Sequence, residues 1–149
     1  MAKILIQTED FDAVEEARLI TQNRHDIGAL VSFIGLCRDD SETLSALELE
    51  HYPGMAEDEI ARIASEAEVR WEIKGLTIIH RVGKIKPGQQ IVLVIAASSH
   101  RTDAFKAADF VMDFLKSRAP FWKKQHLTDG TSSAWVDAKD SDETSLKRW

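Results

Sequence analysis

Two continuous apolar runs constrain the fold of this chain more than any other feature of its sequence. Residues 27–36 and residues 91–97 contain no charged side chain. Runs of this length without alternation are typical of strands that are covered on both faces. Each run therefore predicts a buried central strand.

Amphipathic patterns predict the remaining elements. Apolar residues that recur every three or four positions predict three helices, at residues 11–23, 56–71 and 102–119. Shorter patterns predict four further strands, at residues 3–8, 44–52, 76–82 and, as a short edge strand, 135–136. Pro-Gly pairs at residues 52–55 and 86–89 predict tight turns between these elements.

The order of the elements predicts the fold class. The chain reads strand, helix, strand, strand, helix, strand, strand, helix, short strand, which is not the strict alternation of a doubly wound parallel sheet. This order predicts an α+β fold with a mixed or antiparallel sheet and about three helices. No repeat, low-complexity tract or long linker divides residues 1–149, so the chain is expected to form a single domain.

Two of the helices have recognisable start signals. Asp10 is expected to cap the first helix, whose predicted buried positions are Phe11, Val14, Ala17 and Ile20. Thr102 is expected to cap the third helix, whose predicted buried positions are Phe105, Ala108, Met112 and Leu115. Because proline cannot continue the hydrogen-bond ladder, Pro120 ends this helix near Ala119 and makes the chain fold back at residues 121–122.

The third helix and its flanks reverse the sign of the chain's charge. Residues 98–124 contain six Lys or Arg and three Asp, a net charge of +3 within a chain of net charge −6. A positive concavity in an acidic protein concentrates an anionic small ligand or an acidic partner tail. The alternative is that these cations merely complement the dipole at the end of a helix, as is common.

Composition excludes several function classes. A pI of about 5.4 argues against general nucleic-acid binding, which needs a broad basic face. No apolar run approaches the length of a membrane span and no leader pattern opens the chain, which favours a cytoplasmic protein. The single Cys37 forbids an internal disulfide, and the five His have no metal-ligand spacing, so neither a metal site nor a bound cofactor is predicted.

The lysines at the end of the third helix are the candidate chemical groups. Lys116 is followed by three further cations, Arg118, Lys123 and Lys124. A lysine that is crowded by cations beside an apolar wall, here Phe121 and Trp122, loses its proton more easily and can act as a base or nucleophile. Asp113, one turn back, can instead pair with Lys116 and keep it charged. The residues alone predict a cationic pocket with one or two candidate lysines.

Several segments, in the same order along the chain, resemble those of a known protein family. They are residues 33–38, 49–55, 79–83, 99–101, 112–123, 135–136 and 147–149. With these segments the chain resembles the large catalytic subunit of molybdopterin synthase over almost its full length.

The resemblance implies a fold and an activity. It implies an α/β hammerhead-like fold, a homodimer, and a heterotetramer in which a small ubiquitin-like sulfur-carrier subunit docks at each end. The carrier's C-terminal glycine, as a thiocarboxylate, would deliver sulfur to cyclic pyranopterin monophosphate and form the dithiolene of molybdopterin. The implied activity is therefore that of a sulfurtransferase in molybdenum cofactor biosynthesis.

The resemblance also implies roles for residues. Lys116 and Lys123 match the family's catalytic lysines. The implied substrate-binding residues are Arg38, His100, Arg101, Lys124 and Lys139. Arginine suits a phosphate because its forked donors can bind two oxygens at once.

Three features depart from the family pattern. Cys37 stands where an aliphatic residue or threonine is usual, and Asp39 and Asp40 follow Arg38 in place of a more neutral loop, which would weaken phosphate binding. Lys139 stands where arginine is frequent. Two alternatives to the sulfurtransferase are a non-catalytic adaptor that captures an acidic protein tail, and a lysine Schiff-base enzyme acting on a phosphorylated carbonyl compound.

Overall fold

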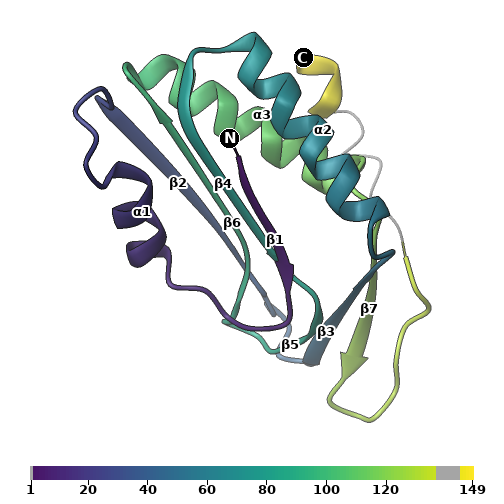
Figure 1. The fold of residues 1–149 in the computed structure, drawn as a ribbon. Helices are drawn as coiled ribbons and strands as arrows, with labels where there is room; N and C mark the ends of the chain where they lie inside the picture. The colour runs from purple at the N-terminus through teal and green to yellow at the C-terminus, as the bar shows by residue number, and fades with distance from the viewer. Residues whose placement is uncertain (1, 137–144) are drawn as a thin grey trace.

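A four-stranded sheet forms the middle layer of the molecule. The computed structural model describes residues 2–136 and 145–149 (Figure 1). The strand order is β1 (Lys3–Gln7), β4 (Ile73–Arg81), β6 (Gln90–Ser98) and β2 (Ala29–Leu36). β1 runs parallel to β4, whereas β4 and β2 are both antiparallel to β6. The sheet is therefore mixed, and the predicted α+β class is confirmed.

Helices cover both faces of this sheet. α2 (Met55–Arg70) and α3 (Arg101–Ser117) lie on one face, α1 (Ala13–Thr21) lies on the other, and the chain ends in the short helix η1 (Leu146–Arg148) (Figure 1). The strands alternate between the two cores: Ile78 faces the larger core beneath α2 and α3, and Ile79 faces the smaller core beneath α1.

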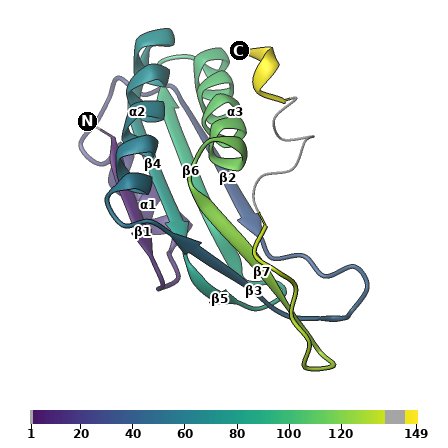
Figure 2. The same ribbon diagram turned by 90° about the vertical axis from the view of Figure 1, so that its right-hand side faces the viewer.

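A second, three-stranded sheet extends from one end of the molecule. It has the order β5 (Gly83–Ile85), β3 (Leu44–His51) and β7 (Phe121–Leu127), and all its pairings are antiparallel (Figure 2). Neither β5 nor β7 was predicted. β5 has only three residues, and β7 carries Lys, Gln and His, so its pairing with β3 has no clear sign in its own pattern.

The prediction for residues 27–36 was wrong about burial. β2 lies at the edge of the four-stranded sheet, and it exposes Leu30, Phe33, Ile34 and Leu36. The matching prediction for β6 is confirmed, because its residues 91–97 are all buried. A continuous apolar run indicates that both faces of a strand favour burial, but within one chain only β6 is buried on both faces.

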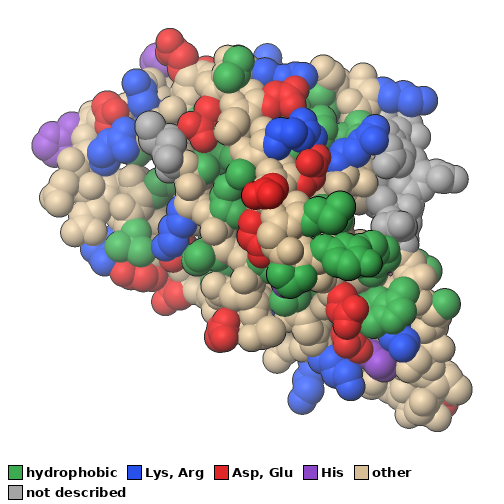
Figure 3. Space-filling model, turned by 45° about the vertical axis from the view of Figure 1, so that its right-hand side comes forward, with side chains coloured by type: hydrophobic (Ala, Val, Ile, Leu, Met, Phe, Trp, Pro, Cys, Tyr) green, Lys and Arg blue, Asp and Glu red, His purple; other side chains and the backbone are tan. Residues whose placement is uncertain are grey.

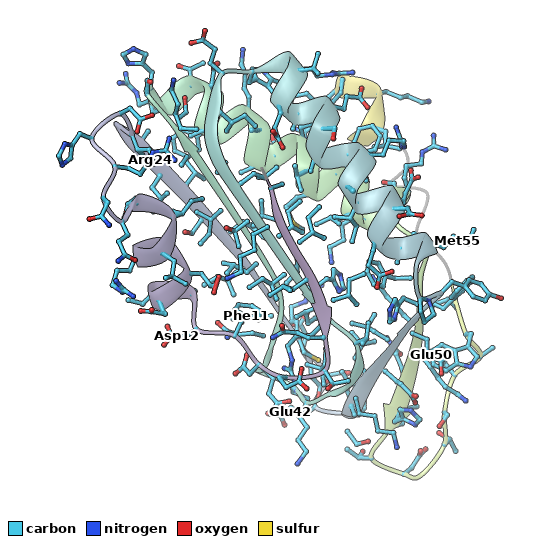
Figure 4. All side chains as sticks on the ribbon, viewed as in Figure 1. Phe11, Asp12, Arg24, Glu42, Glu50 and Met55 are labelled. Carbon is cyan, nitrogen blue, oxygen red and sulfur yellow. The ribbon has the colours of Figure 1, made fainter. Side chains whose placement is uncertain are left out.

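Both helix caps lie elsewhere than predicted. Asp12, not Asp10, caps α1 and accepts a hydrogen bond from the Glu15 backbone N–H at 3.0 Å; Figure 4 marks Asp12 where the chain enters the helix. His100, not Thr102, occupies the N-cap of α3, and it makes no side-chain capping bond.

Two of the predicted buried helix positions are exposed. Val14 is 82% exposed and Phe105 is 60% exposed. The other predicted positions are confirmed, because Ala17 and Ile20 pack against the smaller core and Ala108, Met112 and Leu115 are buried. β4 also starts earlier than predicted, at Ile73.

The two Pro-Gly turns are confirmed. Gly54 and Gly88 both have a φ of +86°, a conformation that residues with a Cβ adopt only with strain. The first turn leads directly into α2, whose buried residues include the predicted Ile60, Ile63, Ala64 and Ala67. The second turn leads into β6.

Candidate active site

A pocket lies where the end of α3 meets the second sheet. Its walls are mostly apolar, and three basic side chains line it: Lys116 from α3, Lys123 from β7 and His80 from β4. The apolar wall consists of Leu47, Leu49, Ile91, Leu115, Ala119 and Phe121. The structure therefore brings the two predicted catalytic lysines together.

Pro120 positions both lysines. α3 ends at Ser117, and the chain turns so that the Phe121 backbone N–H donates to the Ala119 carbonyl at 2.8 Å. β7 then runs back along β3 with Lys123 opposite Leu49. Because side chains alternate along a strand, Phe121 and Lys123 face the pocket, and their neighbours in sequence face the other way.

His80 is the functional candidate that sequence reasoning missed. It was interpreted as a structural strand histidine, and the structure places it, 6% exposed, in the wall of the lysine pocket. Its ring stacks on Phe121 with centroids 4.0 Å apart. The only sequence signal was its place in residues 79–83, one of the segments that carry the family resemblance.

The environment keeps His80 neutral. Burial lowers the pKa of His80 to about 4, and the positive charges of Lys116 and Lys123 contribute to the same shift. Nδ1 of His80 lies 2.9 Å from the carbonyl oxygen of Arg81. Since a carbonyl only accepts hydrogen bonds, Nδ1 carries the proton and Nε2 is an acceptor.

Lys124 lies on the opposite face of β7 from Lys123. Its ammonium lies 5.3 Å from the centre of the Trp135 ring, a cation–π distance. On the same face Trp122 makes an edge contact with Tyr52, with ring centroids 4.8 Å apart. The predicted short strand at residues 135–136 is seen as a bridge in which Val136 pairs with Lys123.

Arg38 lies in the loop that follows β2. Its side chain is 84% exposed, and its Nε lies 3.3 Å from the carboxylate of Asp40. Asp39 instead accepts hydrogen bonds from the backbone N–H groups of Thr43 and Leu44, at 3.3 and 3.1 Å. The two departing acids thus have different roles: Asp39 shapes the loop, and Asp40 competes with an anion for Arg38.

His100 and Arg101 lie at the far end of α3 from Lys116. Fifteen residues of α-helix separate Arg101 from Lys116, which corresponds to about 22 Å. One chain therefore does not bring these two residues into the lysine pocket. Lys139, the remaining predicted site residue, lies outside the described residues.

Within residues 2–136 and 145–149, no group of His, Cys, Asp or Glu is arranged to hold a metal ion. The helices in this part of the chain are all too short or too polar to cross a membrane. Cys37 is buried, and burial raises the pKa of its thiol, as suits the predicted packing role.

Comparison with known proteins decides the family. The sequence model of the family described as MoaE protein matches residues 6–118. The chain belongs to this family. A molybdopterin synthase catalytic subunit from Mesorhizobium japonicum is 63% identical over 146 residues, which cover 98% of this chain and 92% of the relative.

Solved structures of family members share the fold. The molybdopterin biosynthesis MoaE protein of Burkholderia ambifaria has a TM-score of 0.87 and 49% identity, covering 100% of this chain and 98% of its own. A complex of subunits 1 and 2 of the molybdopterin-converting factor of Helicobacter pylori matches with a TM-score of 0.71 over 93% of this chain and 90% of its own. Its identity is 19%, so this match supports the fold alone. The predicted family is confirmed, and with it a role as the catalytic subunit of an enzyme of molybdenum cofactor biosynthesis.

Proposed function

We propose that the chain transfers sulfur from the thiocarboxylated C-terminal glycine of a small carrier subunit to cyclic pyranopterin monophosphate. The observation that carries this proposal is the convergence of Lys116 and Lys123 in one largely apolar pocket. A thiocarboxylate is anionic, and two cations in a low-dielectric pocket attract it more strongly than they would in water. A cytoplasmic location stays a prediction.

The pocket supports distinct roles for its basic groups. The carrier's sulfur forms a bond to a carbon of the pterin while a carbon–oxygen bond at the same carbon breaks and the oxygen leaves with a proton. Water then attacks the glycine acyl carbon, directly or after transfer of the acyl group to Lys116, so that the bond between this carbon and the sulfur breaks and the carrier is released as a carboxylate. Lys116 polarises the glycine carbonyl or accepts the acyl group when the sulfur leaves, and Lys123 moves protons and stabilises developing negative charge. His80 supplies an acceptor nitrogen, because its Nδ1–H is directed to the Arg81 carbonyl.

The carrier is the proposed protein partner of this chain. Relatives that are 63% and 59% identical are named catalytic subunits of molybdopterin synthase, which supports an enzyme with a further subunit here as well. The wall of the lysine pocket suits the narrow, extended tail of a chain that ends in glycine, since glycine has no side chain to accommodate. With two copies of each subunit, the assembly would be a heterotetramer.

A homodimer is proposed because β2 leaves an apolar edge uncovered. Leu30, Phe33, Ile34 and Leu36 are all exposed along this unpaired edge, which is unusual for a chain that works alone. Because His100 and Arg101 lie about 22 Å along α3 from Lys116, their proposed contact with the substrate phosphate requires a second copy of the chain.

The two lysines provide the direct test of the reaction. In single-turnover assays with thiocarboxylated carrier and cyclic pyranopterin monophosphate, Lys116→Ala and Lys123→Ala should each lower the rate of product formation at least about 100-fold, the usual contribution of a positioned proton-transfer group. Lys106→Ala, which removes an exposed lysine from the same helix, is the matched control and should keep full activity. A Lys116→Ala variant with the wild-type rate would rule out a role of Lys116 in the reaction. If the chain were only an adaptor, the variants would bind the carrier more weakly, and the wild-type chain itself would form no product.

Mixing variants tests whether two copies share a site. Lys116→Ala and Arg101→Ala chains should each be inactive alone, and an equimolar mixture that is allowed to exchange subunits should regain activity. A mixture as inactive as its components would show that Arg101 does not serve the pocket of a second copy.

A further inference from the structure

The Nε2 atom of His80 is a hydrogen-bond acceptor without a partner among the described residues. His80 is only 6% exposed, and its one hydrogen bond within residues 2–136 and 145–149 joins Nδ1 to the Arg81 carbonyl at 2.9 Å. A buried acceptor that stays unpaired costs free energy, so nearly all such groups in folded proteins have a partner. Nε2 therefore indicates a ligand that brings a hydrogen-bond donor.

Nε2 borders the pocket and is not enclosed in the core. In the described part of the chain, no fully enclosed side-chain nitrogen or oxygen lacks a hydrogen-bond partner. An unpartnered Nε2 is therefore not sealed from solvent, and the lysine pocket is the space that the His80 side chain lines. A donor that enters the pocket can reach this atom while the ring stays in place.

The surrounding contacts hold the ring and its tautomer. The ring stacks on Phe121 with the two planes 13° apart. The Arg81 guanidinium donates to the Thr8 carbonyl at 3.1 and 3.0 Å and to the Gln90 carbonyl at 2.8 Å. These bonds fix the residue whose own carbonyl accepts from Nδ1. Burial lowers the pKa of His80 to about 4, so at neutral pH the ring is neutral and Nε2 keeps its lone pair.

The other side chains of the pocket offer no comparable acceptor. Among the described residues that line it, six are apolar, and the ammonium groups of Lys116 and Lys123 are donors only. His80 thus supplies the side-chain acceptor of this wall. A carrier tail that ends in glycine presents an anionic end group and, on the adjacent carbon, the N–H of its last peptide bond. The ammonium groups suit the anionic end, and Nε2 suits the N–H.

We propose that Nε2 of His80 accepts a hydrogen bond from the N–H of the last peptide bond of the carrier tail. This bond fixes the tail at the residue that carries the reacting sulfur and makes His80 a binding residue of the lysine pocket. A tail whose last residue has no N–H, such as one that ends in proline, would leave Nε2 unpaired. The inference rests on the proposed function in one respect, that the carrier tail enters this pocket, and it does not depend on the chemistry that follows.

An amide-to-ester exchange in the carrier tests the proposed bond directly. The carrier is prepared by semisynthesis with a terminal carboxylate, which transfers no sulfur, and with either glycine or glycolate as its last residue. The ester lacks the N–H and changes the shape of the tail very little. Calorimetric titration should show that the wild-type chain binds the ester carrier about 10-fold more weakly, because a buried acceptor loses its donor. Equal affinity for the two carriers would overturn the proposal.

Replacing the histidine tests whether Nε2 is the acceptor. His80→Phe keeps a ring that can stack on Phe121 but has no acceptor, so it should bind the amide carrier about 10-fold more weakly than the wild type and bind both carriers equally. His80→Leu, which also lacks an acceptor, gives the same test if the phenylalanine variant does not fold. His80→Gln places Oε1 close to the position of Nε2 and should recover part of the preference for the amide.

His25→Phe is the matched control, because it makes the same replacement at an exposed histidine between α1 and β2 and should behave like the wild type. If His80→Phe or His80→Leu keeps the wild-type preference for the amide, another group accepts the N–H and the proposal is overturned. The binding measurement needs no turnover, so it is separable from the sulfur-transfer assays. A chain that forms product but binds both carriers equally contradicts only the role of His80, and a chain that prefers the amide carrier but forms no product contradicts only the proposed reaction.

Discussion

His80 is a base whose ring the folded protein keeps neutral, with a proton on Nδ1 and none on Nε2. In the unfolded chain its pKa is near 6.5, and burial beside Lys116 and Lys123 lowers the folded value to about 4. Between these two pH values the unfolded state binds more protons than the folded state, so protonation favours unfolding. The stabilisation is complete above about pH 6.5 and is lost as the pH falls towards about 4.

The pH dependence of folding stability should therefore report on His80. We expect the wild-type free energy of unfolding to fall by up to about 3 kcal/mol from this group between pH 7 and pH 4. His80→Gln, which cannot titrate, should show a correspondingly shallower decline in urea titrations at the same pH values. Equal slopes for the two proteins would mean that His80 is not buried as a neutral group.

At the scale of the elements, one close approach holds β2 and the start of α3 together. A Cβ on Gly28 would lie 2.2 Å from the carbonyl oxygen of Ser99, the residue before His100. The Gly28 backbone N–H also donates to the Ser98 carbonyl at 2.9 Å. Since a backbone oxygen cannot rotate away, only glycine fits here without moving the segment that carries His100 and Arg101.

Gly28→Ala should destabilise the fold by about 1 to 3 kcal/mol, as overpacking usually does. Gly75→Ala is a matched control in the same sheet, because its new Cβ would meet side-chain atoms and no backbone: Cγ1 and Cδ1 of Ile20 at 2.8 and 2.9 Å, and Cβ of Ala97 at 3.7 Å. The flexible Ile20 side chain can move, so thermal denaturation should show a smaller loss for Gly75→Ala. Equal losses would contradict the contrast between a rigid and a movable neighbour.

At the scale of the whole molecule, attraction of an anionic carrier tail has to come from a local field. The chain carries a net charge of −6, and Figure 3 shows acidic and basic side chains intermixed over the face in view. Salt screens such fields over about 8 to 10 Å. Surface charge should therefore change mainly the rate at which the carrier associates with this chain.

We expect the association rate of the carrier to fall as ionic strength rises, with a much smaller effect on dissociation. Lys124→Glu, on the outer face of β7, should mimic the effect of salt in stopped-flow binding. Lys74→Glu makes the same change of charge at the start of β4 and serves as the control. An association rate that responds to neither salt nor Lys124→Glu would exclude electrostatic steering at this site.

Local sequence rules determined the elements that depend on their own residues. The apolar run of β6, the buried stripe of α2, the Pro-Gly turns and the end of α3 before Pro120 all follow from steric limits and periodicity within a short segment. The family resemblance added the pairing of Lys116 with Lys123, which the residues alone left as one or two candidate lysines.

Tertiary structure decided what depends on contacts between distant segments. Periodicity shows that a segment has an apolar face, but it does not show whether the same chain covers that face. For this reason the pattern of β2 did not reveal that the strand lies exposed at an edge. The pairing of β7 with β3 turns Lys123 towards Lys116, and the position of β4 adds His80 to the same pocket. The length of α3 separates Arg101 from that pocket, and the indole N–H of Trp149 donates to the carboxylate of Asp113. These outcomes depend on the arrangement of distant segments in space, which no local pattern contains.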